Sequence, residues 1–80
     1  MKKVGELVKI KENADEIRTD HLHDTCVTPY MCREYAGNTG KIIAVEKKRY
    51  TDQLVYNIDS WWWEEYYLES IGNFNCSSLI

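Results

Sequence analysis

The chain has 80 residues and a net charge of −3, with 44% hydrophobic and 29% charged residues. A chain of this size forms one domain with one hydrophobic core, and no apolar run approaches the ~20 residues that cross a bilayer. The acidic balance disfavours binding driven by counterion release from nucleic acid. Three cysteines, an odd number, without an apolar signal-peptide core predict a cytoplasmic protein with free thiols rather than a disulfide framework.

The first extended segment is predicted over residues 4–11, with Gly5 at a turn or bulge before its apolar part. Residues 12–28 then form a long, polar and acidic connection, which is typical of a functional or partly disordered segment. Residues 14–18 can form a helical turn within it. The sizeable apolar anchors of this connection are Ile17, Leu22 and Val27.

One short helix is predicted over about residues 29–36. Thr28 can cap its start, and Pro29 suits the first helical position because its missing N–H has no partner there anyway. Met31 and Tyr35 are four residues apart and share an inward face. Gly37 ends the helix, because glycine adopts positive φ without steric cost.

The most apolar strand is predicted over residues 41–47, after a turn that ends at Gly40. Ile43 and Val45 share one face of this strand, while Ile42 and its neighbour Ala44 share the other. Apolar residues on both faces predict a central strand that is covered on both sides for part of its length.

A polar hairpin loop at residues 48–53 leads to a strand over 54–59, where alternation directs Leu54, Tyr56 and Ile58 to the core. A strand is then predicted over residues 61–64 and a single 3₁₀ turn over 64–66. A closing strand with Leu68 buried follows over residues 67–71, and residues 72–80 are predicted as a tail.

The run Gly40-Lys41-Ile42-Ile43-Ala44-Val45, entering a hairpin, resembles the second strand of SH3-like small β-barrels, including KOW-type domains. Three further parts of the chain resemble a phage and bacterial version of that barrel. Residues 3–10 resemble its first strand and residues 31–37 its inserted helical turn. Its last three strands are resembled by residues 56–59, 61–63 and 67–69. The resemblance implies a mostly β, five-stranded SH3-like barrel over residues 1–71, with one inserted helix and a tail at 72–80. Such barrels bind peptides, nucleic acid or other proteins, so the resemblance implies a fold and not an activity.

The three consecutive tryptophans are the first candidates for a binding surface. On a strand, Trp61 and Trp63 point to one face and Trp62 to the other, so we expect one parity in the core and the other at the surface. A partly exposed Trp62 is a good interaction residue. Trp62 can form an aromatic surface with nearby tyrosines, like the surface with which SH3-like domains bind proline-rich peptides. The candidate tyrosines are Tyr30, Tyr50, Tyr66 and Tyr67. Alternatively, the tryptophans only fill the core of a small domain. The favoured function is a non-enzymatic protein- or peptide-interaction module without a cofactor.

Nucleic-acid binding is the alternative. Lys47, Lys48 and Arg49 precede Tyr50 in a basic hairpin over residues 47–50, so cations for phosphates lie beside a ring that can stack on a base. Acidic residues in the 12–28 connection and over residues 59–69 oppose this function unless the charges occupy separate faces.

A zinc-stabilised loop at residues 21–32 is a lower alternative. Five possible metal ligands lie within it, but their spacing matches no common zinc finger; they are His21, His23, Asp24, Cys26 and Cys32. Catalysis has little support in the sequence, because Glu64 and Glu65 point apart on a strand and no nucleophile or phosphate-binding motif is recognisable.

Overall fold

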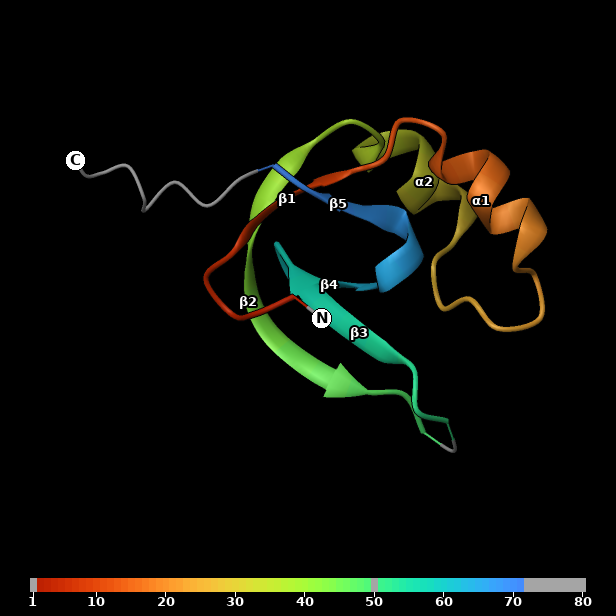
Figure 1. Cartoon of the computed structure of the whole chain (residues 1–80). Coiled ribbons are helices and arrows are strands. Elements are labelled where there is room, and N and C mark those ends of the chain that lie inside the picture. The colour runs from red at the N-terminus through yellow and green to blue at the C-terminus, as the bar shows by residue number, and fades with distance from the viewer. Residues whose placement is uncertain (1, 50, 72–80) are drawn as a thin grey trace.

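A computed structural model describes residues 2–49 and 51–71. Its five strands pair antiparallel in one sheet of order β4-β3-β2-β1-β5 (Figure 1). The strands are β1 (Leu7–Ile10), β2 (Thr39–Lys47), β3 (Leu54–Ile58), β4 (Trp61–Glu64) and β5 (Leu68–Ser70). The predicted mostly β class is confirmed. A closed barrel is not, because β4 and β5 lie at opposite edges of the sheet and no pairing joins them within the described part of the chain.

Strand β2 is central, as predicted, because its first part pairs with β1 and its second part with β3. The register with β3 shifts between Ile42 and Ala44, which marks a bulge at Ile43. Ile42 is fully buried, whereas Ile43 is 57% exposed. The part of this strand that is covered on both faces therefore does not include Ile43.

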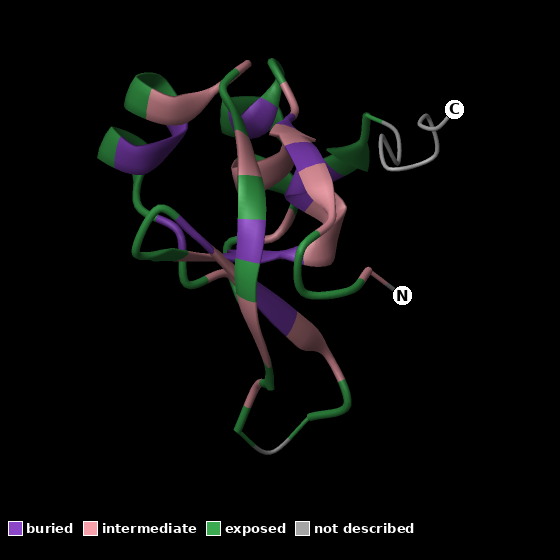
Figure 2. Ribbon diagram, turned by 90° about the vertical axis from the view of Figure 1, so that its left-hand side faces the viewer, coloured by how far each residue is buried: buried purple, intermediate pink, exposed green. Residues whose placement is uncertain are grey.

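The core lies on the face of the sheet that carries Ile42, Tyr56 and Trp63 (Figure 2 shows the buried positions in purple). Tyr56 and Ile58 are buried and Leu54 packs against them, as the alternation in β3 predicts. Val55, on the opposite face of β3, is also buried but is not part of this core cluster. The second face of the sheet is therefore covered near β3 and β4 as well.

The predicted helix is present as α2 (Pro29–Tyr35). The Thr28 hydroxyl accepts the Met31 N–H at 3.1 Å, and Pro29 occupies the first turn. Met31 is buried and Tyr35 packs against the core. Gly37 has φ +84°, the left-handed conformation that ends the helix at its C′ position. The signals at both ends of the predicted helix are thus confirmed.

A second helix, α1 (Ala14–Asp20), corrects the expectation of a single inserted helix. Its N-cap, Asn13, makes no side-chain capping bond, so packing rather than capping stabilises it. Ala14 is fully buried, and its carbonyl oxygen accepts a hydrogen bond from the Cys32 thiol of α2 at 3.6 Å. Arg18 donates to the Val27 carbonyl at 3.0 Å, which joins α1 to the segment before α2. No helix in the described ranges is long and apolar enough to span a membrane.

Several predicted boundaries move. The first strand begins at Leu7 rather than residue 4, because Gly5 turns the chain at φ +93° and leaves Val4 exposed. The 3₁₀ turn, η1 (Glu65–Tyr67), comes one residue later than predicted and is followed by β5, with Leu68 buried as expected. The predicted tail at residues 72–80 lies outside the described residues.

Candidate functional site

Glu64, at the end of β4, is the one charged side chain among the described residues that is completely buried. It pairs in register with Val55 of β3, and its side chain lies on the face opposite the main core. Burying a carboxylate is costly unless charge and hydrogen bonds compensate it. The groups that surround Glu64 are therefore the first place to look for a site.

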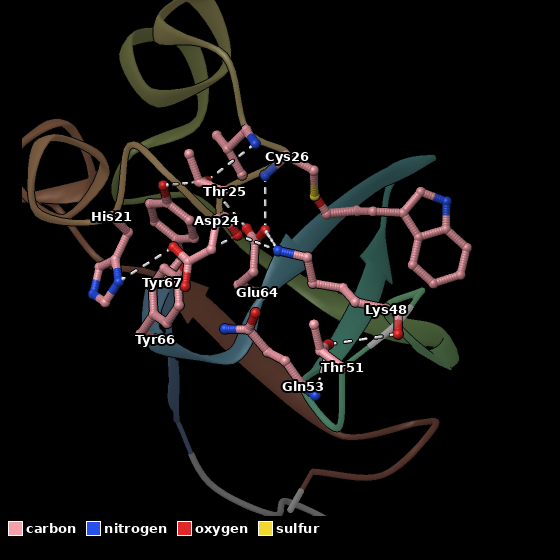
Figure 3. Close-up of polar contacts among 12 residues, drawn as sticks. His21, Asp24, Thr25, Cys26, Lys48, Thr51, Gln53, Glu64, Tyr66 and Tyr67 are labelled. Atoms are coloured by element: carbon pink, nitrogen blue, oxygen red, sulfur yellow. Dashed lines mark hydrogen bonds and ion pairs between the residues drawn. The ribbon is translucent and has the colours of Figure 1, made fainter.

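Three groups from two separate loops compensate Glu64 (Figure 3). Its Oε2 atom accepts the Cys26 backbone N–H at 2.7 Å and pairs with the Lys48 ammonium at 3.0 Å. Its Oε1 atom accepts the Thr25 hydroxyl at 3.3 Å. The Lys48 ammonium also donates to the Asp24 carbonyl. We call Thr25, Cys26, Lys48 and Glu64 the Glu64 cluster; it holds the long connection and the β2–β3 loop against the end of β4.

An aromatic stack lies beside this cluster. The His21 imidazole stacks on the Tyr66 ring with centroids 3.8 Å apart and planes 13° from parallel. The Tyr66 hydroxyl lies 3.3 Å from Asp24 Oδ1, and His21 Nδ1 lies 3.6 Å from the same oxygen. Leu22, which follows His21, is 56% exposed. We call His21, Leu22, Asp24 and Tyr66 the loop surface: His21, Asp24 and Tyr66 contact one another, and the exposed Leu22 is next to His21 in the chain.

The titratable groups around the cluster are held neutral. Partial burial, with the Glu64 carboxylate next in importance, raises the pKa of the Cys26 thiol to about 11. Burial raises the pKa of Tyr67 to about 12, against a hydrogen bond with Thr25 that lowers it. Burial and the nearby Glu64 and Asp24 carboxylates also raise the pKa of Tyr66. A thiol with so high a pKa is almost entirely protonated at neutral pH, and the protonated form is a poor nucleophile.

The tryptophan strand follows the predicted alternation only in part. Trp63 is 1% exposed and lies in the core, and Trp62, on the opposite face, is half-buried. Trp61 shares the face of Trp63 but is 42% exposed, because it begins β4 directly after the turn, where Asp59 and Ser60 have positive φ. Its indole N–H donates to the Tyr35 hydroxyl at 3.0 Å.

The candidate tyrosines do not form one surface. Tyr66 belongs to the loop surface, whereas Tyr30 is exposed in the first turn of α2. Tyr67 was expected at the surface, but it is fully buried, with its ring edge-on to Trp63 at 5.5 Å. Tyr50 lies outside the described residues.

The basic residues at the end of β2 and the start of the β2–β3 loop likewise lie in different environments. Lys48 is paired with Glu64 inside the cluster, and its side chain is only 19% exposed. Lys47 is exposed and lies 3.7 Å from Asp52 across the hairpin. Arg49 is exposed. Of the predicted binding residues, Lys48 lies in the Glu64 cluster as an ion-pair partner and Tyr66 lies in the loop surface.

The zinc hypothesis gains no support from the geometry. His21 stacks on Tyr66, the Cys26 thiol lies 3.8 Å from the Trp62 carbonyl, and Cys32 is buried against α1. Within residues 2–49 and 51–71, no three His, Cys, Asp or Glu side chains are grouped so that they could hold a metal ion.

The sequence reasoning missed Glu64 as a site residue. It did predict that Glu64 and Glu65 diverge, and this is confirmed, since Glu65 accepts the Tyr56 hydroxyl at 3.2 Å and pairs with Lys2. No pattern marks Glu64 as buried, because its partners lie 16 and 38 residues away in the chain.

Comparison with known proteins adds no relative: neither a family model, nor a curated protein, nor a solved structure matches this chain.

Proposed function

We propose that this chain is a non-enzymatic module that binds a protein or peptide, built on an SH3-like barrel. Three features support the barrel: the strand order, the long connection between β1 and β2, and the 3₁₀ turn η1 directly before the closing strand β5. In an SH3-like barrel the first long connection lies beside the ligand groove. That connection is where the loop surface lies in this chain.

The observation that carries the proposal is the loop surface itself. Leu22, the neighbour of His21 in the chain, is exposed, and the Asp24 carboxylate is half-exposed next to the histidine–tyrosine stack. Exposed apolar and aromatic side chains with an adjacent hydrogen-bond acceptor are typical of protein-interaction surfaces. The partner is a peptide segment that presents an apolar side chain to Leu22 and Tyr66 and a donor to Asp24.

The nucleic-acid alternative is less well supported. Of the basic residues at the β2–β3 hairpin, Lys48 in the loop is neutralised by Glu64, and Lys47 at the end of β2 lies near Asp52. Binding to phosphates scales with the number of cations that can reach them, so this loop offers less than its sequence indicates.

Selection from a random peptide library, followed by NMR mapping of the selected peptides, tests the proposal. We expect amide shifts at residues 21–24 and 66. Leu22→Asp should abolish binding, while Ile43→Asp, a matched change at an equally exposed position of β2, should not. Shifts that fall elsewhere, or equal loss in both variants, contradict the assignment of the surface.

A salt titration against generic DNA and RNA tests the alternative. The proposed function predicts no binding even at low salt. Steep, salt-dependent binding that Lys47→Met and Arg49→Met weaken would instead make nucleic acid the main partner.

A further inference from the structure

The burial of Glu64 depends on two segments that are far apart in the chain. Cys26 and Thr25 reach it from the loop before α2, and Lys48 reaches it from the β2–β3 loop. The main core lies on the other face of the sheet. Glu64 is therefore screened from water by both loops, so that moving one of them leaves the carboxylate covered by the other but without part of its hydrogen-bond and ion-pair partners.

The two loops also contact each other through the same ion pair. The Lys48 ammonium donates both to Glu64 and to the Asp24 carbonyl, so one nitrogen joins β4 to both loops. If the β2–β3 loop moves away, the Asp24 carbonyl in the loop before α2 loses its Lys48 donor. The Glu64 carboxylate, still covered by that loop, then lacks its counter-charge. The remaining Cys26 and Thr25 contacts are then less favourable, because an unpaired buried charge is expensive.

We propose that the Glu64–Lys48 pair couples these two loops, so that residues 24–27 and the described part of the β2–β3 loop open together. Glu64 is then a positioning residue for the loop surface, and Lys48 is its counterpart on the other loop. A partner that engages Asp24 or Leu22 alters the β2–β3 loop through this pair. The inference deepens the proposed function, but the coupling exists in the free protein and can be measured without any ligand.

Native-state hydrogen exchange, read amide by amide by NMR, tests the coupling. The Val27 N–H donates to the Thr25 hydroxyl, and the Lys48 N–H donates to the Gln53 carbonyl, so each loop has a reporter amide outside the ion pair. In Lys48→Met we expect the protection of Val27 to fall at least ~10-fold, although Lys48 does not bond to that amide. The matched control is Lys47→Met at the adjacent, exposed position, which should leave Val27 unchanged.

The reverse direction uses Thr25→Val, which removes the hydroxyl contacts to Glu64, Tyr67 and the Val27 N–H but keeps the Glu64–Lys48 ion pair. Coupling between two elements is reciprocal, so a change in the loop before α2 should also lower the protection of the Lys48 amide in the β2–β3 loop. Tyr56, in the centre of the sheet, reports whether the fold remains intact in both variants.

The proposal is overturned if Lys48→Met exposes only the β2–β3 loop while Val27 keeps its wild-type protection, or if Thr25→Val leaves the Lys48 amide unchanged. Should Lys48→Met fail to fold, Thr25→Val alone decides the question. If no peptide is selected but the exchange of the two loops is coupled, the proposed function is rejected and the coupling stands. If a peptide binds the loop surface but the exchange is not coupled, the proposed function stands and the coupling is rejected.

Discussion

Replacing Lys48 by methionine removes the cation that pairs with Glu64 at 3.0 Å and keeps most of the side-chain volume. Loss of one partner from a buried ion pair costs about 3–5 kcal/mol. Glu64 retains two hydrogen-bond donors, and 19% of the Lys48 side chain is exposed, so we expect a loss somewhat below this range, about 2–3 kcal/mol. For a small domain with a urea dependence of about 1 kcal/mol/M, the unfolding midpoint falls by roughly 2–3 M.

Urea denaturation followed by tryptophan fluorescence measures this loss, since Trp63 is buried in the core. Lys47→Met is the matched control. Because the contact of Lys47 with Asp52 is exposed and 3.7 Å long, we expect the free energy of unfolding to change by less than ~0.5 kcal/mol. Glu64→Gln combined with Lys48→Met should cost at least ~1 kcal/mol less than the sum of the single changes, because the two residues interact directly. Additive losses, or a Lys48→Met midpoint equal to that of the control, would refute the reasoning.

The other predictions concern the α2 helix and the thiol. Gly37→Val should destabilise by more than ~1 kcal/mol in a thermal melt, because φ is +84° and the new Cβ lies 3.3 Å from Glu12 Cγ; an unshifted melt contradicts this. Thr28→Ala should cost about 1 kcal/mol in urea through loss of the N-cap, and Thr28→Ser, which keeps the hydroxyl, should restore most of it. At pH 8, alkylation of Cys26 in the folded protein, followed by mass spectrometry, should be roughly 100-fold slower than in urea, because its pKa rises from 9.0 to about 11. By the same shift, the neutral thiol stabilises the fold fully below pH 9 and loses this contribution as the pH rises towards 11; equal alkylation rates in both states rule this out.

Local signals in the sequence predict the elements whose stability is local. Thr28, Pro29 and Gly37 specify both ends of α2 through capping and backbone preference, and the structure confirms each contact. The alternation in β3 likewise identifies Tyr56 and Ile58 as core residues. These features need no knowledge of distant segments.

Helix α1 and the Glu64 cluster depend on distant segments and were not predictable in the same way. Helix α1 lacks a side-chain cap, and it exists because Ala14 is buried against α2. Glu64 looks like a surface residue after an aromatic run, and only the folded chain brings Lys48 and Cys26 to it. Trp61 departs from its expected burial for a geometric reason, since the turn before it places it at the end of the strand.

Strand β1 has no partner that is near it in sequence. One neighbour, β2, begins only after two helices, and on the other side Val8 pairs with Ser70. During synthesis, therefore, a nascent chain that lacks β5 has no partner for one side of β1, and its first strand stays incompletely paired until nearly the whole domain has left the ribosome. High contact order of this kind slows folding, because the entropy of closing long loops is lost before distant pairs form.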